Sequence, residues 1–150
     1  MTEDPFNLNR FVDAQESIYS SALFELEAGQ KRSHWMWFIF PQIAGLGSSP
    51  TATFYAIKSI REAEAYLAHA VLGPRLQECT KTLLSISGRS VAEIFAYPDD
   101  LKFCSSMTLF DNVSSGDCVF ADALNQYCGG TRDAKTVEIL ENKYSTTMKL

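Results

Sequence analysis

The sequence lacks the features that mark a membrane protein, a secreted protein or a zinc-binding protein. Its longest apolar run, residues 35–40, is far shorter than the roughly 20 residues of a bilayer span. The N-terminus is acidic and contains no apolar signal core, so we expect a cytoplasmic protein that does not associate with membranes. The cysteines form no C-x-x-C pair. We therefore expect no metal site and interpret them as reduced thiols packed in the core: Cys79, Cys104, Cys118 and Cys128.

The common catalytic motifs are also missing. The chain contains no G-x-S-x-G, H-E-x-x-H, G-x-G-x-x-G or Walker loop, and no internal repeat. Gly45 and Gly47 form a G-x-G pair, but no strand pattern precedes them. We therefore expect no cofactor, and the sequence leaves open whether the chain is an enzyme.

Charge is scarce in total but unevenly distributed. The net charge of −5 argues against general nucleic-acid binding. Residues 1–30 carry six acids and one base, residues 31–89 carry seven bases and three acids, and residues 90–150 carry nine acids and five bases. The middle of an acidic chain is therefore basic, and both tryptophans and both histidines lie in that part.

What the chain does contain is helical periodicity. Hydrophobic residues make up 46% of the 150 residues, enough for an ordinary core in a single domain. Apolar residues recur every three or four positions, and no alternating strand pair is present. We predict an all-α fold, an irregular orthogonal bundle of about eight short helices over residues 1–150, with a tail that frays beyond about residue 142.

Capping residues set the expected helix boundaries. Asp4-Pro5 is expected to open a first helix that ends at Gly29, and Ser33 to open a short second helix that ends near Phe40. The aromatic residues of this second segment also suit a strand. Further starts and stops are expected at Pro50, the Ser59–Glu62 and Ser90–Glu93 capping boxes, Gly73-Pro74, Pro98, Asp117, Gly129-Gly130 and Thr131.

The first candidate site is the basic and aromatic segment that begins at Lys31. If a helix begins at Ser33, its free N–H groups and its dipole favour an anion. The guanidinium of Arg32 suits a phosphate, and an indole suits a flat ring. The alternative is that these aromatics form core and the bases are solvated. We predict that the ligand-binding residues are Lys31, Arg32, His34, Trp35, Trp37 and Gln42.

Two other groups of residues are weaker candidates. His34 and His69 are the only histidines, and we interpret them as satisfied or solvent-facing because no third metal ligand accompanies them. Helical spacing would bring Lys102 beside Ser106, a pairing that can activate a nucleophile. In the simpler interpretation, two serines in a helix are ordinary and Asp99 or Asp100 only favours the helix start. If a phosphorylated ligand binds at the first candidate site, Asp100 or Asp111 would supply a base.

Seven segments of the chain carry a family resemblance: Asp4–Phe6, Arg10–Gln15, Lys31–Gln42, Gly45–Ser48, Tyr66–His69, Leu72–Leu76 and Lys102–Phe110. Through these segments the chain resembles an uncharacterised domain-of-unknown-function family of small cytosolic helical proteins that are often labelled calpastatin. The resemblance implies an all-helical fold and no assigned activity. The family pattern often has proline where this chain has Ala70, in an expected loop.

Two functional hypotheses follow. In the first, the chain binds or processes a small phosphorylated, nucleotide-like molecule, by analogy with all-helical glycosidases that act on ADP-ribose derivatives. In the second, it is a non-catalytic module whose exposed aromatics meet a protein partner. We do not expect protease inhibition, because the inhibitory segments of calpastatin are disordered whereas this chain would bury its apolar residues in its own core.

Overall fold

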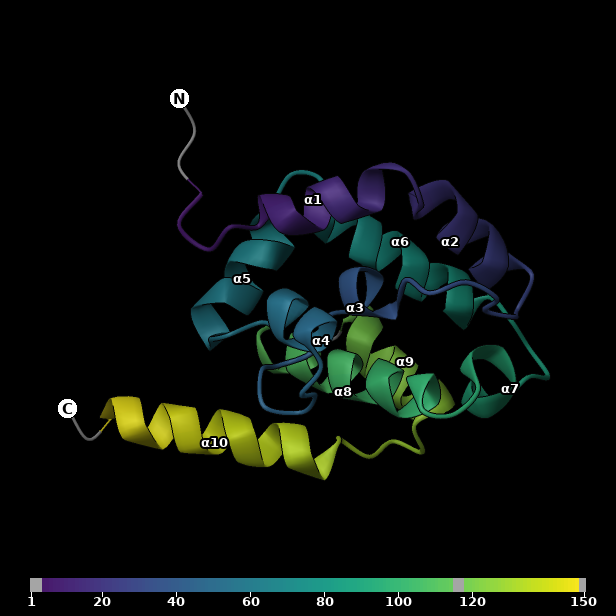
Figure 1. The fold of residues 1–150 in the computed structure, drawn as a ribbon. Helices are drawn as coiled ribbons and strands as arrows, with labels where there is room; N and C mark the ends of the chain where they lie inside the picture. Colours follow the sequence, from purple (N-terminus) through teal and green to yellow (C-terminus); the bar gives the residue numbers. More distant parts are fainter. Residues whose placement is uncertain (1–3, 115–117, 149–150) are drawn as a thin grey trace.

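The structure is a computed structural model that describes the backbone of residues 4–114 and 118–148 (Figure 1). These residues form ten helices and no strand; one isolated parallel bridge joins Ile43 to Ile57. The all-α prediction is confirmed, with ten helices in place of about eight. The helices are α1 (Asn9–Glu16), α2 (Tyr19–Glu27), α3 (Met36–Ile39), α4 (Pro50–Tyr55), α5 (Ile60–Ala68), α6 (Leu72–Leu84), α7 (Val91–Phe95), α8 (Asp99–Asn112), α9 (Val119–Tyr127) and α10 (Ala134–Met148).

The N-terminal segment contains two helices where one was predicted. Asp4 does act as a cap, because its two carboxylate oxygens accept from the N–H groups of Leu8 and Asn9 at 2.8 and 2.9 Å. The helix nevertheless begins at Asn9, because Asn7 has a positive φ of 53° that interrupts helical backbone. A break at residues 17 and 18 then separates α1 from α2.

Most of the other local signals are confirmed. Ser90 and Glu93 form the complete capping box of α7, and Ser59 caps α5 through the N–H of Glu62. Pro98 precedes α8, and Gly129 and Gly130 end α9 with φ of 67° and 71°. Asp117 lies outside the described residues, and Cys118 is the N-cap of α9. The fraying expected beyond residue 142 stays a prediction.

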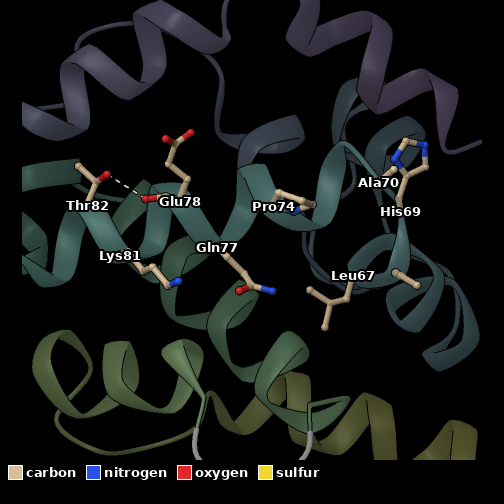
Figure 2. Close-up of a pocket in the computed structure, with 9 residues that line it drawn as sticks. Leu67, His69, Ala70, Pro74, Gln77, Glu78, Lys81 and Thr82 are labelled. Carbon is tan, nitrogen blue, oxygen red and sulfur yellow. Dashed lines mark hydrogen bonds between the residues drawn. The ribbon is translucent and has the colours of Figure 1, made fainter.

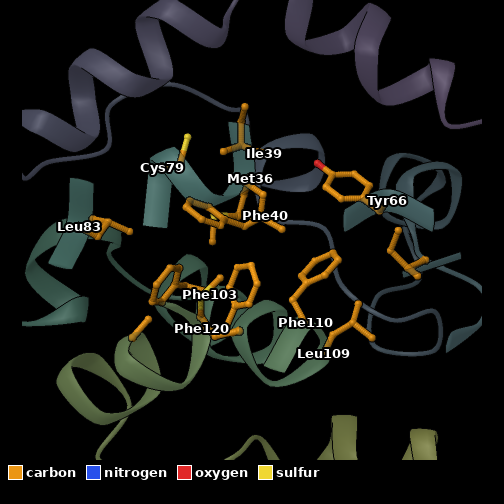
Figure 3. Packing of buried hydrophobic residues seen from close by; sticks show 14 of the residues in the cluster. Met36, Ile39, Phe40, Tyr66, Cys79, Leu83, Phe103, Leu109, Phe110 and Phe120 are labelled. Atoms are coloured by element: carbon orange, nitrogen blue, oxygen red, sulfur yellow. The ribbon is translucent and has the colours of Figure 1, made fainter. Parts of the chain in front are cut away.

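One aromatic core joins the helices (Figure 3). The one-turn helix α3 packs against both α1 and α8, which lie on opposite sides of it in Figure 1. In α8, Phe103 and all residues from Ser105 to Asp111 are buried, so this helix is covered on all sides in its second half. Phe40 and Phe103 meet edge to face with ring centroids 5.1 Å apart.

A disulfide corrects the prediction that the cysteines are all reduced. Cys104 of α8 is bonded to Cys128, the residue that follows α9, with Cα atoms 6.0 Å apart. Cys79 and Cys118 are free thiols, and burial raises the pKa of Cys79 to about 12. The C-x-x-C spacing detects metal and redox motifs but not a disulfide between two cysteines that are 24 residues apart in the sequence.

No helix in the described part of the chain combines the length and the hydropathy that a membrane crossing requires.

Candidate functional site

The backbone N–H groups after Lys31 do not face an external anion, because Glu25 of α2 already binds them. Its Oε1 accepts from the backbone N–H groups of Arg32 and Ser33 at 2.7 and 3.0 Å and from Nε1 of Trp35 at 2.9 Å. Its Oε2 accepts from the hydroxyl of Ser33 at 2.5 Å. Helix α3 consequently begins at Met36, and the prediction that a helix begins at Ser33 is wrong.

The charge of Glu25 is stabilised by these bonds. Burial raises the pKa of Glu25, but the hydrogen bonds from Ser33, Arg32 and Trp35 outweigh it and lower the pKa to about 2, from an ordinary value of 4.5. The carboxylate is therefore a permanent part of the fold at neutral pH. It occupies the position that the sequence suggested for a ligand's phosphate.

We expect this pKa to appear as acid sensitivity. A group whose folded-state pKa is depressed stabilises the fold above its unfolded pKa, and that contribution disappears as the pH falls from about 4.5 towards 2. Glu25→Gln should lower the free energy of unfolding at pH 7 by about 1–3 kcal/mol, the range for a buried charged hydrogen-bond acceptor. Unfolding in urea at pH 7, 4.5 and 3 measures this difference, which should shrink as the pH falls.

The control for that measurement is Glu27→Gln, an exposed glutamate on the same helix. It should leave stability at pH 7 within about 0.5 kcal/mol of the parent chain. A Glu25→Gln variant as stable as the control would show that the carboxylate does not hold the segment.

Lys31 and Trp35 belong to the interior, contrary to a direct ligand role. The indole of Trp35 is only 1% exposed, so no flat ring can stack on it in this structure. The ammonium of Lys31 lies 5.0 Å from the Trp35 ring centroid and 2.9 Å from Oδ2 of Asp99, and its side chain is 6% exposed. Arg32 and His34 are exposed, and Arg32 donates to the side chain of Gln30 at 3.2 Å.

Trp37 and Gln42 instead line a cleft of about 460 Å³, a size typical of small-molecule sites. Trp37 is half-buried, and the ammonium of Lys102 lies 5.5 Å from its ring centroid. The cleft brings together residues of α3, the loop after it, α4, the first half of α8 and the start of α10. Its lining residues are Trp37, Gln42, Leu46, Gly47, Ser48, Ser49, Ala52, Pro98, Leu101, Lys102, Ser105, Asp133 and Lys135.

The loop over this cleft is held by backbone bonds. Ala44 N–H donates to the carbonyl of Ile57 and Ile57 N–H donates to that of Gln42, both at 2.8 Å. Gly47 has to be glycine, since a Cβ there would lie 2.8 Å from the Cβ of Ala52. A narrow recess of about 20 Å³ shares Trp37, Gln42, Gly47 and Ala52 with the cleft.

The predicted catalytic residues do not form a catalytic group. The hydroxyl of Ser106 is fully buried without a hydrogen-bond partner, so the Lys102–Ser106 pair does not form. Asp100 accepts from the N–H of Leu101 at 2.9 Å, which is a helix-start role. Of these candidates, Lys102 is the one that lines the cleft.

Asp111 has a structural position as well. It is buried at the end of α8 and accepts from Nε of Arg132 at 3.0 Å. It thereby anchors the linker between α9 and α10 to α8, and it is not among the residues that line the cleft.

A second, more open groove of about 760 Å³ runs along α6 and the turn before it (Figure 2). His69 lies there, where its Nδ1 accepts from the N–H groups of Val71 and Leu72 at 3.0 and 3.2 Å. His69 is therefore a satisfied helix cap, and these bonds require its neutral form to carry the proton on Nε2. Among the side chains that the structure describes, no group of three His, Cys, Asp or Glu is arranged to hold a metal ion.

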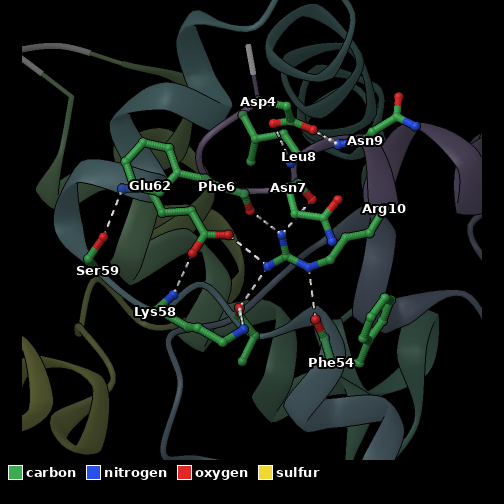
Figure 4. Close-up of polar contacts among 11 residues, drawn as sticks. Asp4, Phe6, Asn7, Leu8, Asn9, Arg10, Phe54, Lys58, Ser59 and Glu62 are labelled. Atoms are coloured by element: carbon green, nitrogen blue, oxygen red, sulfur yellow. Dashed lines mark hydrogen bonds and ion pairs between the residues drawn. The ribbon is translucent and has the colours of Figure 1, made fainter.

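A buried ion pair that no sequence pattern predicted joins Arg10 of α1 to Glu62 of α5 (Figure 4). Nη2 of Arg10 lies 2.7 Å from Oε2 of Glu62, and the two side chains are 4% and 3% exposed. The guanidinium also donates to four backbone carbonyls at 2.8–3.0 Å: those of Phe6, Asn7, Phe54 and Ala56. The one available signal was that Arg10 is the single base among the first 30 residues.

Comparison with known proteins agrees with the fold. Residues 5–140 match the family described as "Protein of unknown function (DUF1810)", and the chain belongs to this family. The chain is similar to the conserved hypothetical protein Rv1873 from Mycobacterium tuberculosis, whose crystal structure is known. The two are 55% identical with a TM-score of 0.90, over 92% of this chain and 99% of the other. No curated protein matches the sequence.

Proposed function

We propose that the chain binds a small anionic molecule with a flat ring, of the nucleotide-like class, in the cleft beside Trp37. The observation that carries the proposal is the position of Lys102, whose ammonium lies over the half-buried indole at the cleft wall. An aromatic ring beside an ammonium group matches a ligand in which a base adjoins a phosphate.

The other lining residues support the same class of ligand. Two lysines, Lys102 and Lys135, line the cleft with one carboxylate, Asp133. That carboxylate already accepts from the N–H and hydroxyl of Thr136 at 3.0 and 2.6 Å. The ionisable lining is therefore positive, in a chain whose net charge is negative. Gln42 adds a carboxamide, a group that pairs with base or sugar edges.

The two tryptophans make this proposal testable by fluorescence. Binding of ADP should quench Trp37, which lines the cleft, and not Trp35, which is sealed by the core. The titration excites tryptophan at about 295 nm, at the red edge of indole absorption. Trp35→Phe should keep the full quenching by ADP, and Trp37→Phe should lose it. The Trp37→Phe variant should also bind ADP about tenfold more weakly, because one stacking surface is reduced.

Lys81→Met is a control for a change outside the cleft, since Lys81 lines the open groove on α6 and not the cleft. It should leave the response to ADP unchanged. If ADP, AMP and ADP-ribose all fail to alter Trp37 fluorescence in the parent chain, the proposal is wrong.

A protein-interaction module is the second candidate function, and two exposed side chains at or next to cleft residues favour it. Leu101, which lines the cleft, is 55% exposed, and Tyr97, which precedes the cleft residue Pro98 in the chain, is 80% exposed. Exposed large apolar side chains are a feature of protein contact surfaces. Two results together would support this alternative. The chain would bind no nucleotide, and a protein partner would co-purify with the parent chain but not with a variant in which Tyr97 and Leu101 are replaced.

A further inference from the structure

Three charged side chains connect the predicted basic segment to the cleft. The carboxylate of Asp99, in the first turn of α8, lies between the ammonium groups of Lys31 and Lys102. Its Oδ2 is 2.9 Å from Lys31 and its Oδ1 is 3.5 Å from Lys102. Two positive charges therefore share one negative charge beside the cleft.

The two lysines are held unequally. Lys31 is 6% exposed, lies within hydrogen-bond distance of Asp99, donates to the carbonyl of Ser33 at 2.5 Å and packs on Trp35. Lys102 is 29% exposed, lies beyond the usual hydrogen-bond distance from Asp99, and lines the cleft. Lys31 is thus a fixed partner of Asp99, whereas Lys102 is a loose one.

We infer that Asp99 holds Lys102 until an anion binds, and that Lys31 is the positioning residue that keeps Asp99 paired once Lys102 turns to that anion. This inference rests on the proposed function of the cleft. The carboxylate of Asp99 is only 21% exposed, so loss of its cation would destabilise the protein, and a single lysine would be bound to Asp99 and unavailable to a ligand. Lys31 removes that conflict, because it keeps the carboxylate of Asp99 paired when Lys102 moves to the ligand.

The inference assigns Lys31 a role that differs from the direct contact expected from the sequence. Without Lys31, the negative charge of Asp99 would retain Lys102 and repel the incoming anion. Without the charge of Asp99, Lys102 would be free and Lys31 would no longer matter to binding. The effect of Lys31 must therefore depend on Asp99.

A double-mutant cycle tests this dependence. The probes are ADP and inorganic pyrophosphate, and affinity is measured by calorimetry on Lys31→Met, Asp99→Asn and the double variant, after thermal melting shows that each is folded. We expect Lys31→Met to weaken binding about three- to tenfold in the parent chain, the effect of one charge at a partly exposed site. In the Asp99→Asn background the same change should weaken binding less than about twofold. Asp99→Asn alone should bind the probes more tightly than the parent.

Each outcome decides between the two proposals. If the parent chain binds the probes and Lys31→Met weakens binding equally in both backgrounds, Lys31 acts on the ligand directly and the inference is overturned, while the proposed function stands. If Lys31→Met does not fold, Asp99→Asn decides by itself, and weaker binding than the parent overturns the inference. If the parent binds neither probe, both proposals fail. Lys81→Met serves as the unaffected control.

Discussion

Replacing Arg10 with methionine should lower the free energy of unfolding by about 3–5 kcal/mol, the largest effect expected of any single substitution described above. The variant leaves the carboxylate of Glu62 almost fully buried without its cation, and four backbone carbonyls lose a donor. Glu62 would keep its bond from the N–H of Lys58, at 2.9 Å. That bond cannot replace the charge of a guanidinium beside a carboxylate that is only 3% exposed.

Unfolding in urea, followed by circular dichroism, measures this effect. Arg61→Met is the matched control, because Arg61 is an exposed arginine one position before Glu62. It should change stability by less than about 0.5 kcal/mol. Arg10→Lys should still be strongly destabilised, since an ammonium cannot make the five bonds of the guanidinium fork. An Arg10→Met variant within about 1 kcal/mol of the parent would show that the pair does not hold α1 to α5.

The double variant Arg10→Met, Glu62→Met separates the cost of a lone charge from the value of the pair. Two apolar side chains of similar size leave no buried charge, so the double variant should recover part of the stability lost in Arg10→Met. The remaining deficit would then come from the backbone carbonyls that the guanidinium satisfies.

Reduction of the disulfide between Cys104 and Cys128 should lower the free energy of unfolding by about 3 kcal/mol. The estimate follows from the loop of 24 residues that the bond closes in the unfolded chain. Melting of the parent chain with and without dithiothreitol measures the effect. Mass spectrometry after alkylation shows which cysteines were oxidised.

The double variant Cys104→Ala, Cys128→Ala provides the control, because it retains the two free thiols, Cys79 and Cys118. Its melting temperature should equal that of the reduced parent and should not respond to dithiothreitol. Equal melting of the parent chain in the oxidised and reduced states would contradict the stabilising role of the bond.

The helix boundaries that were predictable are those set by neighbouring residues. The capping box of Ser90 and Glu93 closes over three residues, and glycines at 129 and 130 can adopt positive φ without the steric cost that a side chain would add. Ser33 failed as a helix start because Glu25, eight residues earlier, takes up its N–H and hydroxyl groups. A local signal is reliable only when no distant side chain competes for the same donors.

The candidate site was only partly predictable, for the same reason. Trp35 and Trp37 are two residues apart and look equivalent in the sequence. In the structure, Trp35 is buried and donates to Glu25, whereas Trp37 lines the cleft. The sequence places Lys31 and Lys102 in separate candidate sites, and only the structure shows that the carboxylate of Asp99 lies between them. Periodicity identifies which segments are helical, but it does not show which side of a one-turn helix faces outward.

By itself, the sequence determined an all-α chain, the position of most helix starts, and a basic, aromatic middle, because periodicity, caps and composition act over a few residues. Only the tertiary structure decided that Arg10 reaches Glu62, that Cys104 bonds to Cys128 and that Trp37 shares a cleft with Lys102. These pairs are separated by 24 to 65 residues, and their contact depends on how the helices pack around Phe40 and Phe103. Packing geometry of that kind is a property of the assembled core and is not encoded in any one segment.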